Sequence, residues 1–365
     1  MRPYLSRFLS VMSGVALVSL ISAPGFAQDM DHSQMDHSQM DHSQMDHSQM
    51  DHSQMDHSGH EMSQEDYRIL REKVMQYQTM SDEEIMGSMM MMPPTYERYV
   101  SDTSLKGDLG VIVLAHGAGE PGDTFFADSL SGLASTYPTS IGFGMAMMNG
   151  DHLQTAVDNL AEAGAKRIVV VPAALSASGS VYEQWAYYFG AREEASYLPA
   201  PRVNQTVPVT LGVPQSSHPL ITEMLTDHAL EVVKDPANTV VIILGHGPEK
   251  YEDNVLELAV LDTHADRMKA SGVFADVRSY NLQDDAPARI RQNNVDVMRS
   301  WIDNAAAYGK DVVVVGYLLS TRGVQHKIAS DFEGLTYAFN EKGLSSNPKF
   351  VKWIEAGVTE FAGKM

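Results

Sequence analysis

A buried-strand pattern that runs into His-Gly occurs twice in the chain, and it constrains the fold more than any other feature. The first copy is LGVIVLAHGAGEPGD at residues 109–123, and the second is TVVIILGHGPEKYED at residues 239–253. At one constant offset, His116 matches His246. A continuous apolar run bounded by glycine is typical of a strand buried on both faces of a sheet. Because such strands end at the ligand-binding edge of parallel sheets, each histidine is predicted to reach a cleft.

A second pair of similar segments supports a duplication, with RIVVVPAALS at residues 167–176 and DVVVVGYLLS at residues 311–320. Strand and helix patterns alternate through both halves, which is typical of parallel sheets with helices on both faces. We therefore predict an α/β protein with two similar lobes, residues 107–236 and 237–365. A helix at 326–341 is among the elements expected in the second lobe.

The residues before the first lobe, 63–106, are predicted to form a connector. Residues 64–78 have helical spacing of their apolar side chains, and Ser81 is a candidate N-cap for a second short helix. Methionines gather in that second segment at 86 and 89–92. A methionine cluster is a potential Cu(I) site, but adaptable apolar packing is the commoner role and is favoured here.

The N-terminal 27 residues have the pattern of a secretory signal peptide. Arg2 and Arg7 precede an apolar core that is too short to span a bilayer, and Ala27 completes a small-residue cleavage site. We expect cleavage after Ala27, export to the periplasm or the medium, and no stable membrane association afterwards. A retained membrane anchor is the alternative.

Residues 28–62 contain six consecutive copies of a five-residue unit, MDHSQ five times and then MDHSG. The methionines are Met30, Met35, Met40, Met45, Met50 and Met55, and the histidines are His32, His37, His42, His47, His52 and His57, with His60 extending the pattern. A period of five fits neither helix nor strand, so the segment is predicted to be disordered without a ligand. Imidazole, thioether and carboxylate together favour metal binding, although a polar spacer is the alternative. The unit resembles the repeats of periplasmic copper-resistance proteins, which implies copper.

Overall composition narrows the remaining function classes. The net charge of −21 argues against nucleic acid and anionic membrane surfaces as partners, and it suits a protein that handles cations. The chain has no cysteine, which excludes disulfides, thiolate metal sites and a cysteine nucleophile. No G-x-S-x-G motif for a serine hydrolase is present.

Three motifs in order along the chain carry a family resemblance: LAHG after the first buried strand, GAKRIVVVP followed by LSASGS, and SSHPLITEML. Together they resemble the sirohydrochlorin cobaltochelatases, which are class II tetrapyrrole chelatases. The resemblance covers roughly residues 109–340. It implies two flavodoxin-like lobes with a cleft between them. It also implies that one histidine after the first strand and another after the third hold a divalent ion above the macrocycle.

The chain departs from that pattern at the second histidine. In the first half Ser180 occupies its place, so His116 lacks a partner. In the second half Val324 occupies the place, but His326 follows two residues later and becomes the expected partner of His246. Either Glu333 or Asp331 is the candidate acidic helper. The resemblance thus implies His246, His326 and Glu333 as catalytic groups, and His116, His246 and His326 as ligands of cobalt, nickel or a similar ion.

Two function classes follow. The first is an exported chelatase, a lyase that inserts a divalent metal into a tetrapyrrole and stores metal on its tail. The second is a non-catalytic copper-binding or copper-tolerance protein built on the same fold.

Aromatic side chains between residues 182 and 197 are candidates for a macrocycle-binding wall, although an amphipathic helix that buries them in the core is the favoured alternative.

Overall fold

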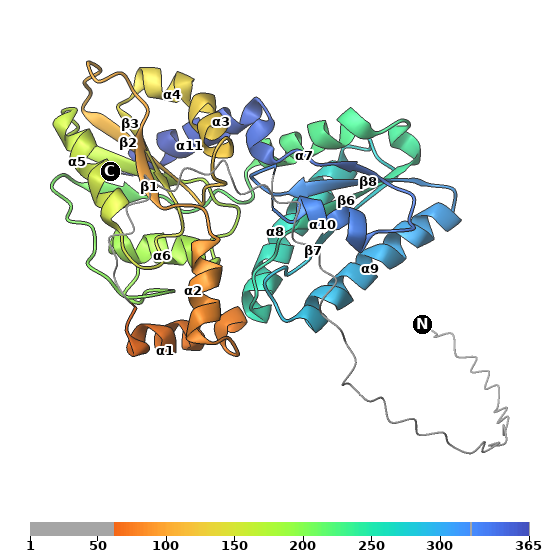
Figure 1. Cartoon of the computed structure of the whole chain (residues 1–365). Coiled ribbons are helices and arrows are strands. Elements are labelled where there is room, and N and C mark those ends of the chain that lie inside the picture. Colours follow the sequence, from red (N-terminus) through yellow and green to blue (C-terminus); the bar gives the residue numbers. More distant parts are fainter. Residues whose placement is uncertain (1–61, 322, 365) are drawn as a thin grey trace, which may run out of the picture. The chain divides into compact units, whose positions relative to one another are not determined.

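Two β-sheets form the centres of two lobes in the computed structural model, which describes residues 62–321 and 323–364 (Figure 1). The strand order is β1-β3-β2-β4-β5 in the first sheet and β7-β6-β8-β9 in the second. Every strand pair is parallel except β1 with β3. The predicted α/β fold with two lobes is confirmed. The signal peptide and the repeat predicted from the sequence lie outside the described residues.

The strands are β1 (Tyr96–Tyr99), β2 (Leu109–Ala115), β3 (Thr139–Phe143), β4 (Arg167–Pro172), β5 (Val209–Leu211), β6 (Thr239–Gly245), β7 (Asp276–Asn281), β8 (Asp311–Tyr317) and β9 (Ala338–Asn340). The helices are α1 (Gln64–Lys73), α2 (Asp82–Met90), α3 (Gly122–Ser129), α4 (Ser131–Thr136), α5 (Asp151–Glu162), α6 (Ser180–Tyr188), α7 (Pro219–Val232), α8 (Tyr251–Ala270), α9 (Ala288–Ala307), α10 (Gln325–Asp331) and α11 (Lys349–Ala362).

The two His-Gly strands occupy the interior of their sheets. Strand β2 lies between β3 and β4, and β6 lies between β7 and β8. Every residue of β6 is buried, as is β2 from its second residue onward, which explains their unbroken apolar sequences. His116 and His246 therefore leave the carboxyl ends of two corresponding strands.

The connector is tied to the first lobe by its own secondary structure. Helices α1 and α2 each begin with a reciprocal capping box, formed by Ser63 with Asp66 and by Ser81 with Glu84. The following strand, β1, pairs antiparallel with β3, with Tyr96 opposite Phe143. The connector thus adds an edge strand to the first sheet.

Two helices are exchanged between the lobes. Helix α7 follows the last strand of the first sheet but packs against β8 and β9 of the second, whereas the C-terminal helix α11 packs back against β4 and β5 of the first. A Cβ atom at Gly212 would lie 2.0 Å from the ring of Phe361, so α11 approaches the backbone at a place where only glycine fits. The indole of Trp353 also donates to the Gln215 carbonyl at 3.2 Å.

The prediction of one helix over residues 326–341 is wrong for the second half of that range. Helix α10 ends at Asp331, and Gly334 adopts a φ of +81° that a helix does not continue through. Residues 338–340 then form β9, which extends the second sheet parallel to β8. The residue types Tyr-Ala-Phe-Asn after a left-handed glycine suit a short strand better than a helix.

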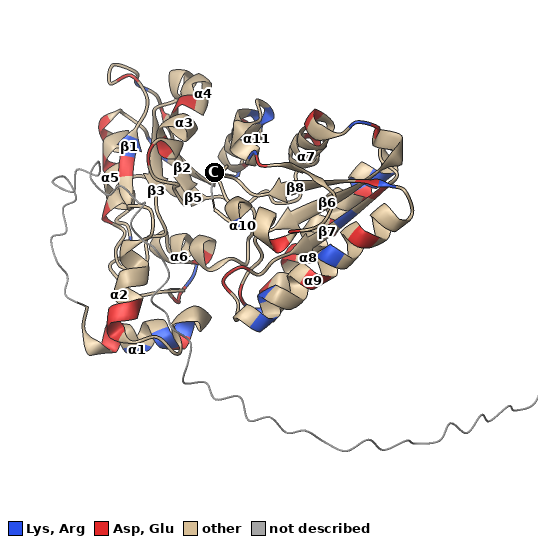
Figure 2. Ribbon diagram, turned by 45° about the vertical axis from the view of Figure 1, so that its right-hand side comes forward, with Lys and Arg blue, Asp and Glu red and all other residues tan. Residues whose placement is uncertain are grey.

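The surface of the described residues carries charges of both signs. Asp and Glu are spread over both lobes, with Lys and Arg interspersed and prominent on α9 (Figure 2). No helix among the described residues is long and apolar enough to cross a membrane.

Candidate functional site

His246 stands at the carboxyl end of β6 between two glycines that its loop requires. A Cβ atom at Gly245 would lie 2.0 Å from Oδ1 of Asn281, and one at Gly247 would lie 2.7 Å from Cβ of the same asparagine. Gly247 also has a φ of +76°, which favours glycine. The Nδ1 atom of His246 donates to the Gly247 carbonyl at 3.0 Å, since a carbonyl can only accept. The Nε2 lone pair is therefore left for a ligand.

Two carboxylates meet His246 from the next strand end. Ligand atoms of His246, Asp284 and Asp285 all lie within 4.8 Å of one another, the one such group of three among the residues that the structure describes. The Nε2 atom of His246 is 3.6 Å from Oδ2 of Asp285, whose side chain is exposed. One imidazole and two carboxylates form a ligand set suited to a borderline divalent ion such as Co²⁺, Ni²⁺ or Zn²⁺.

The backbone fixes these acidic residues beside the histidine. Leu282 donates to the Gly245 carbonyl at 2.9 Å, and the amide of Asp284 donates to the His246 carbonyl at 3.1 Å. Between them Gln283 is held at a φ of +52°, an uncommon conformation for a residue with a side chain. Its amide group donates to the Pro248 carbonyl at 3.0 Å, which offsets part of that strain.

The two carboxylates differ in how firmly they are engaged. Arg291 and Lys327 each donate to Asp284 at 2.7 Å. Burial alone would raise the pKa of Asp284, but these two cations hold it below its ordinary value. Arg291 also makes a bidentate pair with Asp331 at 2.9 and 2.7 Å. Asp284 is thus a fixed carboxylate, whereas Asp285 is the group freer to take up an ion.

Two further carboxyl groups lie around the same loop, Glu249 partly buried and Glu257 buried. Glu249 accepts a hydrogen bond from the amide of Met75 at 3.0 Å, and burial raises its pKa. Glu257, on α8, is 8% exposed and its pKa is raised chiefly by burial, although contacts with Ser176 and the charge of His246 oppose the shift. Glu257 therefore connects the His246 loop to the loop after β4 in the other lobe.

A cavity of about 280 Å³ opens between the loop after β4 and helix α8. Residues 175–178 of the first lobe line one side, and Leu256, Glu257 and Val260 of helix α8 line the other. Tyr317 secures the junction by donating to the carbonyls of Leu175 at 2.9 Å and Ser216 at 3.1 Å. The lobes thus face each other across a space that is largely apolar and contains one buried carboxyl group.

The corresponding position in the first lobe is chemically different. The Nδ1 atom of His116 donates to the Gly117 carbonyl at 3.0 Å, as in the second lobe, and the side chain is exposed. Asp123, however, is 1% exposed and accepts from the amide of Ala118 at 2.7 Å and from the hydroxyl of Tyr96 at 3.1 Å. The loop after β3, the strand next to β2, contains methionines at 145, 147 and 148 where the loop after β7 has carboxylates.

The other predicted site residues lie apart from the ligand group around His246. His326 is exposed on α10, its Nδ1 is engaged with the Gly323 carbonyl, and it belongs to no group of three ligands in the described part of the chain. Glu333 is exposed. Their roles, like those of His116 and His246, stay predictions, and the ligands in the repeat lie outside the described residues.

Asp284 and Asp285 were missed by sequence reasoning. The available signal was the pair of aspartates in NLQDD, directly after the strand that follows the His246 helix. The aromatic segment is mostly core: Trp185 and Tyr188 of α6 are buried in the first lobe, and Tyr182 and Tyr187 pack at its edge. A macrocycle wall is therefore not built from the largest of these rings.

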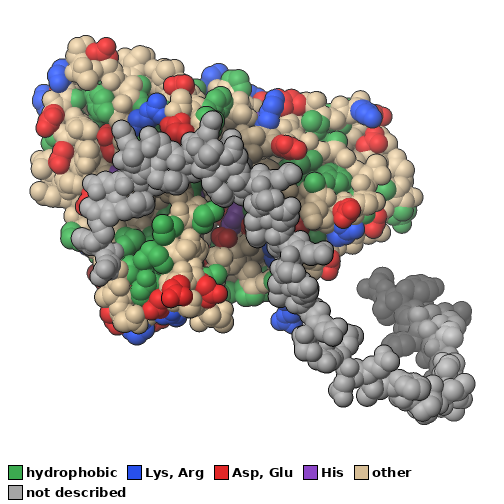
Figure 3. Space-filling model, in the orientation of Figure 1, with side chains coloured by type: hydrophobic (Ala, Val, Ile, Leu, Met, Phe, Trp, Pro, Cys, Tyr) green, Lys and Arg blue, Asp and Glu red, His purple; other side chains and the backbone are tan. Residues whose placement is uncertain are grey.

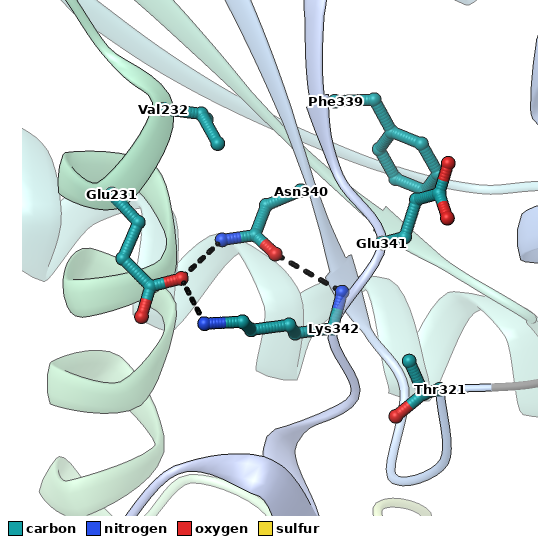
Figure 4. Close-up of a pocket in the computed structure, with 7 residues that line it drawn as sticks. All are labelled: Glu231, Val232, Thr321, Phe339, Asn340, Glu341 and Lys342. Atoms are coloured by element: carbon teal, nitrogen blue, oxygen red, sulfur yellow. Dashed lines mark hydrogen bonds and ion pairs between the residues drawn. The ribbon is translucent and has the colours of Figure 1, made fainter.

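A second hollow, of about 700 Å³, lies at the far edge strand of the second sheet (Figure 4). Glu231 accepts from Asn340 at 2.8 Å and from the ammonium group of Lys342 at 2.9 Å across it. None of the predicted site residues lines this hollow. Glu231, Asn340 and Lys342 are paired with one another and no histidine lines the hollow, so the ligand group at His246 is the better candidate site.

Comparison with known proteins bears on the fold. No protein-family model matches the sequence, and no curated protein matches it. The structure of SirB from Bacillus subtilis with Fe³⁺ is similar, with a TM-score of 0.53 and 16% identity over 70% of this chain and 96% of that one.

Two further solved structures are less similar. CbiX, described as the terminal enzyme for biosynthesis of siroheme in denitrifying bacteria, has a TM-score of 0.44 and 13% identity over 69% of this chain and 98% of that one. DR2241 from Deinococcus radiodurans, described as similar to chelatases, has a TM-score of 0.43 and 19% identity over 68% of this chain and 55% of that one. The likeness to SirB shows that this chain has a chelatase-like fold of two lobes.

Proposed function

We propose that the protein binds a divalent transition metal at the end of β6 and transfers it to a tetrapyrrole held between the lobes. The observation that carries the proposal is the convergence of His246, Asp284 and Asp285. Its support from outside the chain is the likeness in fold to SirB, a protein whose structure was solved with Fe³⁺. The metal is cargo in this proposal, with cobalt or nickel as the expected ion.

The ligand set fits a carrier that must also release its ion. Neutral imidazole and carboxylate bind Co²⁺ and Ni²⁺ reversibly, whereas a closed site of four strong ligands would retain the metal. Asp284 keeps its place through Arg291 and Lys327, so the loop stays organised as an ion arrives and leaves. Two pyrrole N–H protons must depart when metal enters the macrocycle, and Glu257 is a carboxyl group near His246 at the lobe junction.

The test uses the full-length chain, Co²⁺ as the metal, and His116→Ala as the matched control for His246→Ala. Both variants remove an imidazole at a strand end and keep the N-terminal repeat. Any metal that the repeat binds is therefore the same in both titrations. We expect His246→Ala and Asp285→Asn to weaken Co²⁺ binding about ten- to hundredfold in calorimetric titrations. His116→Ala is expected to have a modest effect. Equal affinities in all three variants would contradict the proposed site.

Insertion is measured separately, by the absorbance change of a free tetrapyrrole mixed with Co²⁺ and protein. An increase in rate that is lost in His246→Ala supports the chelatase function. Metal binding that depends on His246 without any insertion favours the second candidate function, a non-catalytic metal-binding or copper-tolerance protein. That alternative is supported by the absence of a second histidine at Ser180 and by the repeat.

The repeat and the leader complete the proposal. Residues 28–62 are proposed to bind several copper ions per chain, and the mature protein is proposed to be exported after cleavage at Ala27. Deleting residues 30–60 should lower copper uptake by several equivalents and leave thermal unfolding of the lobes nearly unchanged. Equal copper uptake with and without the repeat would contradict the first point, and an intact Met1 on exported protein would contradict the second.

A further inference from the structure

Eight methionines meet where the connector packs against the first lobe. They are Met62, Met80, Met86, Met89 and Met92 from the connector, and Met145, Met147 and Met148 from the loop after β3. We call them the methionine cluster. Their neighbours include the buried rings of Tyr67, Tyr77 and Tyr197. Connector and loop are far apart in sequence, so the folded chain brings thioethers together that no local motif contains.

Strand pairing explains why the two segments meet. Tyr96 at the start of β1 lies opposite Phe143 at the end of β3. The connector residues that precede β1 therefore lie beside the loop that follows β3. A Cβ atom at Gly144 would lie 2.4 Å from Oγ1 of Thr95, which shows how closely the segments approach. Met147 is held by its carbonyl, which accepts from the amide of Leu198 at 3.2 Å.

Apolar packing alone does not account for the choice of methionine here. The three other hydrophobic clusters of the described residues are built from aliphatic and aromatic side chains, with Met224, Met268 and Met298 as their buried methionines. Those three are at most 1% exposed. Within the methionine cluster, all members except Met147 are partly exposed. Hydrophobic side chains also gather on the surface over α6 and α2 (Figure 3).

The electrostatic surroundings favour a cation. Tyr77 and Tyr197, which belong to the cluster, both lie in the field of Asp285 and Glu249. The nearby guanidinium of Arg71 is neutralised by Asp82. Thioethers are soft ligands that select Cu(I) over the borderline divalent ions, which prefer imidazole and carboxylate. Ag(I) is the redox-inert ion of the same class.

We propose that the methionine cluster binds a soft monovalent cation of the Cu(I) and Ag(I) class through thioethers from both segments. Met86 and Met89 are three residues apart on helix α2, a spacing that places side chains on the same face of a helix. Met145 and Met148, from the loop after β3, pack against the same buried residues. This site is distinct from the divalent site at His246 and from the N-terminal repeat, and it requires neither of them.

Methionine methyl NMR on the full-length chain tests the proposal residue by residue. With ¹³C-methyl methionine, each thioether gives its own signal, so the repeat and the folded lobes are read separately in one titration with Ag(I). Cluster methyl signals are expected to shift at substoichiometric to stoichiometric Ag(I), and those of Met224, Met268 and Met298 are expected to stay unmoved. Cluster signals that stay in place while the repeat saturates would overturn the proposal.

Leucine substitutions separate ligation from packing, because leucine keeps the apolar volume and removes the sulfur. The variant Met86→Leu/Met145→Leu is compared with Met224→Leu in competition with a chromophoric Cu(I) chelator. The double variant is expected to lose about tenfold or more in affinity at the cluster, with unchanged thermal unfolding, and the control is expected to lose nothing. Equal Cu(I) affinity in both would assign the cluster to packing alone. Should the double variant misfold, the Ag(I) titration of the wild-type chain decides.

Discussion

His152 gives the protein a specific sensitivity to acid that a single substitution should remove. The side chain is 6% exposed in the first turn of α5, and neither ring nitrogen has a hydrogen-bond partner among the described residues. Burial lowers its pKa from 6.5 to about 4. The folded protein therefore keeps His152 neutral at a pH where the unfolded chain already binds a proton.

The difference between these two pKa values fixes how the free energy of unfolding changes with pH. Because the folded-state pKa is depressed, the stability is fully present above pH 6.5 and is lost as the pH falls toward 4. Between pH 7.5 and 4.5, one histidine with these two pKa values removes about 2.5 kcal/mol from the free energy of unfolding. Carboxylate titrations add to the total, but they are common to the wild type and a variant at this position.

The variant His152→Leu keeps a similar apolar volume and removes the titrating group. Urea unfolding followed by circular dichroism should show that its loss of stability between pH 7.5 and 4.5 is smaller than that of the wild type by about 2.5 kcal/mol. At pH 7.5 the variant should be at least as stable, because two unpaired ring nitrogens disappear.

His264→Leu is the matched control. Burial also lowers the pKa of His264 to about 4, but its ring contacts the Thr222 hydroxyl and the Ser216 carbonyl, both at 2.8 Å. This variant should lose acid sensitivity too, yet be destabilised at pH 7.5 by about 1–3 kcal/mol, because the loss of the ring leaves buried polar partners unpaired. If His152→Leu and the wild type lose equal stability on acidification, the reasoning about burial is refuted.

Three further substitutions test the site and its frame. Gly247→Ala forces a Cβ atom to 2.7 Å from Asn281, so it should cost upwards of about 1 kcal/mol in unfolding free energy and weaken Co²⁺ binding at His246, measured by calorimetry. Arg291→Ala leaves the Asp331 carboxylate without its ion-pair partner and leaves Asp284 with Lys327 alone, and should lower stability by about 3 kcal/mol in urea titrations at neutral pH. Tyr317→Phe removes the hydroxyl proton that the carbonyls of Leu175 and Ser216 share, and should lower the unfolding free energy by about 1–2 kcal/mol without changing secondary structure in circular dichroism.

The strands that deliver the histidines were predictable because their pattern is local. A run of buried aliphatic residues ending in His-Gly needs no knowledge of neighbours, and both runs are strands in the interior of their sheets. The division into two α/β lobes follows from the same repetition. The helix predicted over 326–341 failed because Gly334 and a short edge strand interrupt an otherwise plausible run.

The partners of His246 depend on strand order, which the sequence pattern does not contain. Residues 284 and 285 reach the histidine because β7 lies beside β6. The sequence-based prediction placed the partner of His246 after β8, the neighbour of β6 on its opposite side, where His326 follows in the chain. The methionine cluster is hidden for a similar reason, since it depends on an antiparallel pairing between the connector and β3.

The exchange of α7 and α11 makes the second lobe an insert within the first. The chain leaves the first lobe after β5 and returns to it at α11, so the second lobe is tethered at both ends. The two crossings lie side by side, because Trp353 at the return donates to the Gln215 carbonyl at the departure. The lobes are therefore joined by two neighbouring chain segments. A change in the angle between the lobes at these segments would widen or narrow the space between Ser176 and Glu257.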